Sequence, residues 1–269
     1  MPSTSKELRV GTVPYLVGRP LDHGLEQEAG IQLVRDVPAR LVDGLRSGTL
    51  DVALVSSIEL FRQPGYRYLD GLAVAADGYV GSVQVFLKRP IQEVQHIALD
   101  PASRASAALV QTLLFERKGG PPAFTEVPLG DDPREADGAD AWLRIGDPAL
   151  RETLTLDTPA WNPSENWRER TGLPFVFATW IVAPGVDVAP FVDAFGRARD
   201  RGRSDLDALA DRAAREWRLP RSRCIEYLAD ECSYDPGAAM PKALMEFQRR
   251  ASRAGLCDPS LAPEPISLR

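Results

Sequence analysis

Short apolar runs alternate with segments of helical periodicity along the first two thirds of the chain. A continuous apolar run of a few residues bounded by turn residues is typical of a strand buried on both faces. The runs that predict strands are Arg9–Val13, Ile31–Val37, Asp51–Ser56, His96–Leu99, Trp142–Ile145 and Phe175–Val182. Strands that alternate with helices in this way predict an α/β protein with a mostly parallel sheet.

Helical spacing of apolar residues predicts helices between these strands and throughout the C-terminal third. Between strands we expect helices at Arg40–Arg46 and Ser103–Arg117, each followed by glycine, which commonly ends a helix. Beyond the last strand the pattern predicts helices alone, at Pro190–Arg201, Asp205–Trp217, Arg221–Cys232 and Met240–Ala254. The end of the chain, Cys257–Arg269, contains three prolines and is expected to lie extended over the surface.

Two extended apolar runs lie in the middle of the chain, and one or both are predicted to cross between two lobes. They are Leu72–Ala76 and Val83–Leu87, and a return crossing is needed near Phe175–Val182. The chain would then leave a first lobe, build a second and come back, which gives a discontinuous first lobe. The expected boundaries are residues 1–87 plus 180–269 for the first lobe and residues 88–179 for the inserted second lobe.

Composition and charge narrow the class of protein. The chain has 269 residues, of which 44% are hydrophobic and 26% charged, so collagenous, disordered and disulfide-scaffold proteins are excluded. The formal net charge is -6 and the basic residues are scattered, which argues against a nucleic-acid partner. No apolar run approaches the roughly 18 residues of a membrane span, so no membrane partner is expected. The polar start, Met1–Glu7, carries no export signal and predicts a cytoplasmic protein.

Cysteines and histidines are too few for several kinds of site. The cysteines, Cys224, Cys232 and Cys257, are odd in number, which argues against a disulfide framework. With only His23 and His96 besides, neither a metal site nor a catalytic triad is expected. Glycines near the strands form no phosphate-binding motif, so no nucleotide cofactor is expected either.

Candidate binding residues lie where predicted strands end, because ligands of open α/β sheets bind beyond the carboxyl ends of strands. Tyr15 and Arg19 follow the first strand, and Arg19 could hold a carboxylate. Ser56 and Ser57 follow the strand that begins at Asp51, where two hydroxyls can bind an anion or one can cap the next helix. Ser82 opens a proposed crossing strand and is expected to face the cleft.

Two helix starts add further candidates. Ser103 and Ser106 open a helix after a strand, where free N–H groups, the helix dipole and two hydroxyls predict an anion pocket. Gly146 and Asp147 follow another strand, and Asp147 is either an N-cap with proline after it or a cleft carboxylate and general base. These residues predict a cleft for a small anion that carries carboxylates or hydroxyls, without specifying a reaction.

Several of these stretches, taken together and in order, resemble the chorismate dehydratase family of the futalosine route to menaquinone. The resemblance covers nearly the whole chain. It is most specific at Leu50–Glu59 and Leu173–Trp180 and weaker at the Gly-Ser and Gly-Asp pairs. The stretches that carry it are Val13–Leu16, Pro20–Leu21, Gly48–Glu59, Gly81–Val83, Ser103–Ser106, Ile145–Asp147 and Thr171–Trp180.

The resemblance implies a two-lobed fold like that of type II periplasmic binding proteins, with chorismate as substrate and no cofactor. The implied reaction removes water from chorismate to give 3-[(1-carboxyvinyl)oxy]benzoate. The family has a substrate-facing asparagine where this chain has Val17, which cannot form the same hydrogen bonds. The candidate site residues are Ser82 and Asp147 for catalysis and Tyr15, Val17, Arg19, Ser56, Ser57, Ser103, Ser106 and Gly146 for substrate binding.

Two questions stay open at this point. The base is either a carboxylate of the substrate itself or Asp147. The alternative functions are a cytosolic carboxylate-binding protein without catalysis and the related enzyme that cleaves cyclic dehypoxanthine futalosine. The oligomeric state is unknown from the sequence.

Overall fold

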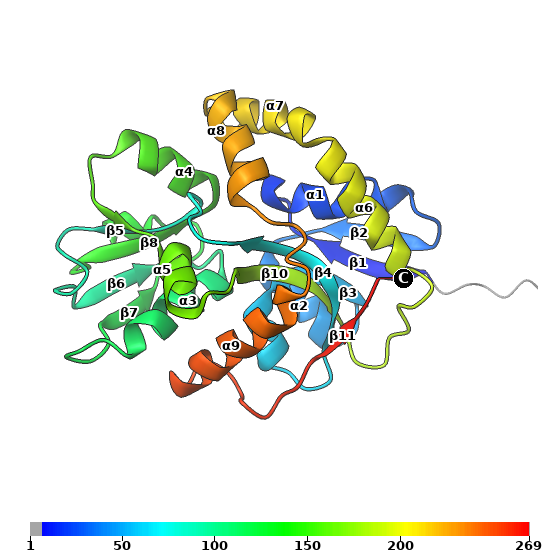
Figure 1. Cartoon of the computed structure of the whole chain (residues 1–269), viewed down its shortest axis with the longest axis horizontal. Helices are drawn as coiled ribbons and strands as arrows, with labels where there is room; N and C mark the ends of the chain where they lie inside the picture. The colour runs from blue at the N-terminus through cyan, green and yellow to red at the C-terminus, as the bar shows by residue number, and fades with distance from the viewer. Residues whose placement is uncertain (1–6, 269) are drawn as a thin grey trace, which may run out of the picture.

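The computed structural model describes residues 7–268 and has two lobes, each built on its own β-sheet (Figure 1). The polar segment Met1–Lys6, on which the expected lack of an export signal largely rests, lies outside the described residues. The first sheet has the strand order β11-β4-β10-β3-β1-β2 and the second β7-β6-β8-β5-β9. The first contains β1 (Leu8–Thr12), β2 (Ile31–Arg35), β3 (Val52–Ser56), β4 (Arg67–Ala76), β10 (Phe175–Val182) and β11 (Glu264–Ile266). The second contains β5 (Val83–Leu87), β6 (His96–Leu99), β7 (Ala123–Glu126), β8 (Ala141–Ile145) and β9 (Ala160–Trp161).

Helices pack around both sheets. Those of the first lobe are α1 (Arg19–Asp22), α2 (Pro38–Ser47), α6 (Val192–Ser204), α7 (Leu206–Trp217), α8 (Arg221–Ile225) and α9 (Ala239–Arg253). Those of the second lobe are α3 (Arg104–Phe115), α4 (Gly146–Thr155) and α5 (Pro163–Thr171). No helix within residues 7–268 combines the length and the apolar character needed to cross a membrane.

The α/β class and every predicted strand are confirmed, with ends that shift by one or two residues. The all-helical C-terminal part is wrong in one respect, because β11 forms a parallel edge strand beside β4, from Glu264↔Arg67 to Ile266↔Leu69. The helix predicted to run from Arg221 to Cys232 is α-helical only to Ile225. It continues as the π-helical turn η5 (Glu226–Glu231), so Cys232 lies beyond the helix.

The chain changes lobes earlier than the sequence pattern predicts. Strand β5 hydrogen-bonds to β8 and β9 in the second sheet, whereas β4 and the whole of β10 lie in the first. The crossings therefore fall between Ala76 and Val83 and between Trp161 and Phe175, instead of near residues 87 and 180. The two apolar runs look alike in sequence because each is a fully buried strand, and only strand pairing distinguishes their sheets.

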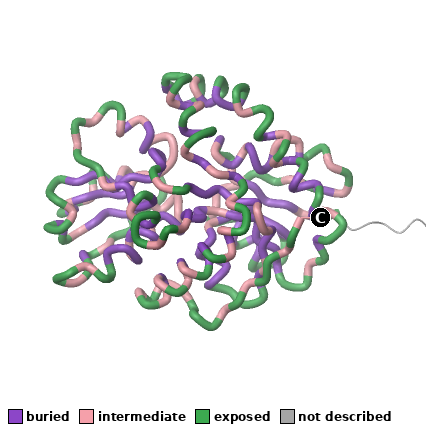
Figure 2. The backbone as a smooth tube through the Cα atoms, in the orientation of Figure 1, coloured by how far each residue is buried: buried purple, intermediate pink, exposed green. Residues whose placement is uncertain are grey.

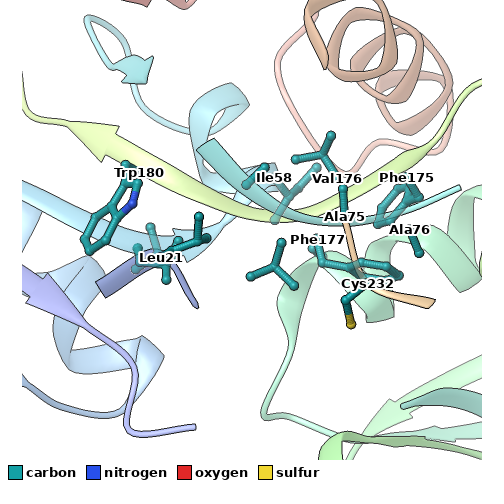
Figure 3. Close-up of a cluster of buried hydrophobic side chains, with 14 of the residues drawn as sticks. Leu21, Ile58, Ala75, Ala76, Phe175, Val176, Phe177, Trp180 and Cys232 are labelled. Atoms are coloured by element: carbon teal, nitrogen blue, oxygen red, sulfur yellow. The ribbon is translucent and has the colours of Figure 1, made fainter. Parts of the chain in front are cut away.

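Buried aromatic side chains of β10 pack against the helices that cover it. Figure 2 shows buried backbone running through the middle of the structure, and Figure 3 shows Phe175, Phe177 and Trp180 of β10. Phe175 makes edge contacts with Trp167 of α5 at 5.5 Å and with Phe247 of α9 at 4.8 Å between ring centroids. Further along β10, Trp180 packs against Phe195 of α6 at 4.9 Å. Large buried rings contribute strongly to core stability, so β10 is anchored near both ends where the chain returns from the second lobe to the first.

Helix α6 lies directly on α1, and Gly202 permits this close approach. A Cβ at Gly202 would lie 2.3 Å from the carbonyl oxygen of Pro20. At Gly196, six residues earlier in α6, the atom nearest to an added Cβ would be a methyl carbon of Leu268 at 3.6 Å, an ordinary van der Waals distance.

We therefore expect opposite effects from the same substitution at these two glycines. Gly202→Ala should lower the free energy of unfolding by about 1–3 kcal/mol because backbone atoms must move apart. Gly196→Ala should leave it unchanged or raise it by up to about 1 kcal/mol, since alanine favours the helix. Urea unfolding followed by circular dichroism measures both, and equal destabilisation by the two variants would contradict the packing described here.

Candidate active site

A cavity of about 380 Å³ lies between the two lobes. The first lobe supplies the loop after β1, the ends of β3 and β4 and the middle of β10. The second lobe supplies the segment that leads into β5 and the starts of α3 and α4, and the end of α7 and the segment after α8 complete the wall. A cavity of this size is at the small end of the usual range for small-molecule sites.

The cavity gathers candidate residues that are far apart in sequence. Each of them follows or precedes a strand of one of the two sheets, so the strand ends meet across the space between the lobes. The candidates that line it are Tyr15, Val17, Ser56, Ser82, Ser103, Ser106, Gly146 and Asp147.

Ser57 and Arg19 are placed elsewhere. The Ser57 side chain is fully buried and its Oγ donates a hydrogen bond to the carbonyl of Val176 at 2.6 Å. Arg19 Nη1 lies 3.4 Å from a carboxylate oxygen of the buried Asp22, and neither side chain lines the cavity. Both expected ligand groups thus have structural partners in the first lobe.

Serine oxygens cap the start of α3. Ser103 Oγ accepts a hydrogen bond from the Ser106 N–H at 3.2 Å and lies 2.9 Å from Ser106 Oγ. Ser56, which belongs to the other lobe, accepts a longer bond of 3.4 Å from the Ala105 N–H. The helix start is therefore a cluster of hydroxyls whose remaining lone pairs and hydrogens are available to a ligand, and it joins the two lobes at the cavity.

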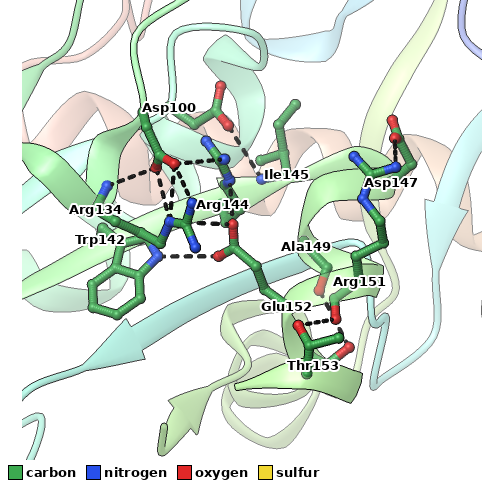
Figure 4. Close-up of polar contacts among 12 residues, drawn as sticks. Asp100, Arg134, Trp142, Arg144, Ile145, Asp147, Ala149, Arg151, Glu152 and Thr153 are labelled. Carbon is green, nitrogen blue, oxygen red and sulfur yellow. Dashed lines mark hydrogen bonds and ion pairs between the residues drawn. The ribbon is translucent and has the colours of Figure 1, made fainter. Parts of the chain in front are cut away.

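Asp100 is a buried carboxyl group of the second lobe that lines the cavity. One oxygen accepts a hydrogen bond from the Ala102 N–H at 3.0 Å and the other from the Ile145 N–H at 3.4 Å (Figure 4). Burial raises the pKa of Asp100 above its ordinary value, although the two N–H groups oppose the shift. The pKa of Tyr15, which lines the same cavity as Asp100 and Asp147, is raised as well, first by burial and then by the negative charges of these two residues.

Arg144 is the one arginine or lysine among the described residues that line the cavity. Its Nε donates to Glu152 at 2.8 Å, and its Nη2 lies 3.4 Å from Asp132 (Figure 4). Glu152 also accepts a bond from the Trp142 indole at 3.3 Å, so Arg144 is held in one orientation. A guanidinium fixed by two carboxylates keeps donors free for a third group in a defined direction.

Asp147 does not cap helix α4. The helix begins one residue earlier, at Gly146, whose φ of +69° favours glycine, and no side chain caps it. The Asp147 carboxylate lies 2.8 Å from Nη1 of Arg151 one turn along the same helix. The N-cap role predicted for Asp147 is therefore wrong, and the group remains a cavity carboxylate with an arginine partner.

Family comparison gives a decisive result. The chain matches the family model described as "Menaquinone biosynthesis" over residues 8–253.

The chain belongs to this menaquinone biosynthesis family.

Relatives and solved structures agree with that assignment. A chorismate dehydratase of Thermus thermophilus is 33% identical over 227 residues, which cover 75% of this chain and 82% of that protein. A chorismate dehydratase of Campylobacter jejuni is 32% identical over 164 residues, or 61% of this chain and 58% of that one. A protein of Archaeoglobus fulgidus superposes with a TM-score of 0.73 at 18% identity, covering 94% of this chain and 99% of that one. The alkanesulfonate-binding protein of Xanthomonas axonopodis superposes at 0.64 with 17% identity, covering 98% and 99%. The predicted periplasmic-binding-protein-like fold is confirmed.

Several residues that line the cavity are not among the candidates of the sequence analysis, Asp100 and Asp131 included. Arg144 lies inside a predicted strand, where an arginine is most simply read as solvent-facing. Trp217, Tyr227 and Cys232 come from the C-terminal helices, whose apolar spacing indicates only a packed face. No local sequence pattern indicates that this C-terminal segment lines the cavity. Within residues 7–268 no group of three or more His, Cys, Asp or Glu side chains is arranged to hold a metal ion.

Ser57 and Ser56 allow a direct comparison of a buried serine that stabilises the fold with a serine that lines the cavity. Ser57→Ala should cost about 1–2 kcal/mol of unfolding free energy, because a buried hydrogen bond to the Val176 carbonyl is lost. Ser56→Ala removes only the long bond to Ala105 and should cost at most about 0.5 kcal/mol. Chemical denaturation of the two variants measures the difference, and a larger cost at Ser56 would refute this assignment.

Proposed function

We propose that this protein removes water from chorismate to give 3-[(1-carboxyvinyl)oxy]benzoate in the futalosine route to menaquinone. The observation that carries the proposal is the cavity lined by serines from both lobes, in a chain of this family. The chorismate dehydratase of Thermus thermophilus, at 33% identity over 75% of this chain, supports the same reaction.

The reaction requires little from the protein beyond correct positioning of the substrate. Chorismate loses the hydrogen of the ring carbon that bears the enolpyruvyl ether and the hydroxyl of the neighbouring carbon. The C–H electron pair forms the new ring double bond, the C–O bond breaks, and the hydroxyl leaves with a proton as water. Because the ring becomes aromatic, the reaction is downhill. The site must fix one conformer, hydrogen-bond the shifting charge and exclude solvent.

Hydroxyl groups and one arginine are suited to the two carboxylates of the substrate. The hydroxyls of Ser103 and Ser106 stand at the start of α3, where the helix dipole favours negative charge. Arg144, oriented by Glu152, offers guanidinium donors from the same lobe. We assign to these groups the binding of carboxylate, and to Ser82 a hydrogen bond with the departing ring hydroxyl.

Val17 lines the cavity where the family places an asparagine. Its side chain has no hydrogen-bonding atom, so another polar group must meet the substrate near it. Ser82 is the hydroxyl we assign to that task.

The three free cysteines, of which Cys224 and Cys232 are buried, fit a protein that works in the reducing cytoplasm.

The proposal is tested by mixing the purified protein with chorismate and following the ultraviolet absorbance of the ring diene. We expect the absorbance to fall and a product to form whose mass is lower by one water. Binding without a spectral change would favour the carboxylate-binding alternative. Turnover of cyclic dehypoxanthine futalosine but not of chorismate would favour the related pathway enzyme.

Asp147→Asn separates the two candidate bases. We infer that a carboxylate of the substrate removes the ring proton, because Asp147 is already paired with Arg151. The variant should then keep at least about a tenth of the wild-type kcat, a loss that excludes a general-base role, since such a role contributes about 100- to 10,000-fold. Asp131→Asn removes the same charge from the rim of the cavity and reports the purely electrostatic effect. A collapse of kcat in Asp147→Asn alone, with chorismate affinity retained, would make Asp147 the base.

A further inference from the structure

The connection from β4 to β5 is the first crossing between the lobes, and it carries Ser82 to the cavity. Within it Asp77 and Tyr79 are exposed, and Gly78 has a φ of +128°, a backbone conformation that other residues rarely adopt. Exposed connections of this kind are the more mobile parts of a fold. Contacts with the rest of the chain are therefore needed to fix the exact place of Ser82.

The second lobe holds the end of this connection by its backbone. The Ser82 carbonyl accepts a hydrogen bond from the Gly146 N–H at 2.8 Å. The buried side chain of Asn162 donates to the carbonyl oxygens of Val80 at 2.8 Å and Val83 at 3.3 Å. Because Gly146 begins α4 and Asn162 precedes α5, these bonds place Ser82 relative to the second lobe. They do not place it relative to the first lobe.

A carboxylate from the C-terminal part of the chain contacts the crossing from the other side. Glu231 is the last residue of η5, and its Oε2 accepts a hydrogen bond from the Gly81 N–H at 2.7 Å. Two residues further on, Ser233 and Ala75 of β4 exchange backbone hydrogen bonds of 2.7 and 2.9 Å. The segment 231–233, drawn in orange between α8 and α9 in Figure 1, therefore spans the crossing from the end of β4 to the residue before Ser82.

Arg223 holds the Glu231 carboxylate in one orientation. Its Nη1 lies 2.7 Å from Oε1 of Glu231, and the two side chains are only 13% and 10% exposed. A buried ion pair is costly unless both groups find further partners. The Gly81 N–H is such a partner for Glu231, and the exposed Glu226, at 3.2 Å, is one for Arg223. The Glu231 carboxylate is thus fixed as an acceptor that points at the crossing.

The ion pair packs so closely over the crossing that it requires a glycine there. A Cβ on Gly81 would lie 2.1 Å from Nη2 of Arg223 and 3.3 Å from Oε2 of Glu231. Gly81 is not one of the glycines with a positive φ, so its backbone conformation alone would allow other residues. The glycine that precedes Ser82 is therefore explained by the contact with Arg223 and Glu231.

We propose that Glu231 is a positioning residue that sets where Ser82 lies in the cavity relative to the first lobe. This inference rests on the proposed dehydration, in which Ser82 meets the departing ring hydroxyl. Glu231 does not itself line the cavity, and it acts through the backbone of Gly81. A hydrogen bond to a leaving group matters most as the C–O bond breaks, so a displaced Ser82 lowers kcat more than it weakens substrate binding.

Glu231→Ala tests this role, because it removes the acceptor of the Gly81 N–H. We expect kcat for chorismate to fall about 10- to 100-fold, with KM within about threefold of the wild-type value. Glu226→Ala is the matched control, since it removes the other carboxylate beside Arg223 and leaves the bond between Gly81 and Glu231 in place. Its kcat should stay within about twofold of wild type. An unchanged kcat in Glu231→Ala, or an equal loss in both variants, would overturn the proposal.

Glu231→Gln distinguishes the hydrogen bond from the charge. Glutamine keeps an oxygen that can accept the Gly81 N–H but lacks the negative charge beside Arg223. We expect its kcat to lie within about threefold of wild type, because the position of Ser82 depends on the acceptor. A glutamine variant as slow as the alanine variant would show that the charge matters instead, and it would refute the role assigned to the bond with Gly81.

Gly81→Ala disturbs the same contact from the other side and serves as a second variant should Glu231→Ala fold poorly. The added methyl group displaces the end of the flexible Arg223 side chain and no backbone atom, so we expect this variant to fold. Because Arg223 and Glu231 must shift together, kcat should fall at least about fivefold. Melting curves verify that each variant is folded at the assay temperature. A folded Gly81→Ala variant with wild-type kcat would contradict the proposal.

A double-mutant cycle with Ser82→Ala determines whether Glu231 acts through Ser82. If it does, Glu231→Ala should lower kcat by less than about twofold once Ser82 is alanine. Full additivity of the two losses would show that Glu231 acts independently of Ser82 and would exclude the positioning role. A wild-type protein inactive on chorismate would refute the proposed function and this inference together, whereas an active wild type with unaffected variants refutes the inference alone.

Discussion

The pairing of β4 with β10 is the constraint on which the site depends. These antiparallel neighbours run from Arg67↔Val182 to Ala76↔Phe175, and both chain crossings leave the first sheet at the Ala76 end. The two connections between the lobes therefore lie side by side, at the same end of this hydrogen-bonded strand pair. Phe175, packed between Trp167 and Phe247, fixes that edge in the core. Ser82 lies only a few residues beyond it, so the sheet determines its position, and the C-terminal segment is tied to the same strand by the bridge between Ala75 and Ser233.

Charge around the cavity explains why hydroxyls and N–H groups carry the binding. Asp100, Asp131 and Asp147 line it, against the single guanidinium of Arg144 among the described lining residues. A doubly negative ligand would be repelled if these carboxylates were all free and ionised. Asp147 is instead paired with Arg151, and burial raises the pKa of Asp100. Neutral donors such as serines can hydrogen-bond the proposed anionic ligand without the desolvation cost of burying a further charged side chain.

Strand ends were enough to predict much of the site. Ser56, Ser82 and Ser103 come together because carboxyl ends and crossings meet between lobes, which apolar runs reveal. Successive side chains at the end of a strand point in opposite directions, but the sequence does not show which of Ser56 and Ser57 faces the cleft. Arg19 could not be separated from a ligand group because its partner, Asp22, is buried only by the packing of α1. Such contacts depend on tertiary structure and leave no local pattern.

The C-terminal segment sets the limit of what periodicity can predict. Its helices bury one face, as their spacing indicates, yet Tyr227, which lines the cavity, belongs to a π turn that breaks the spacing. Likewise β11 is only three residues long and contains Pro265, so it carries no strand pattern of its own and forms because an edge of β4 is open to it.

Ser56 connects binding to the closure of the lobes. Its oxygen accepts the Ala105 N–H of the opposite lobe, and nearby the buried Glu59 lies 3.2 Å from Arg104 of the same helix. These contacts bring the start of α3, with Ser103 and Ser106, against the first lobe. A ligand bound there adds to the same contacts, so binding energy favours the closed arrangement. In the reaction proposed above, closure would remove water from around the ring hydroxyl, and a hydrogen bond from Ser82 would then act in a less polar medium, where it is stronger.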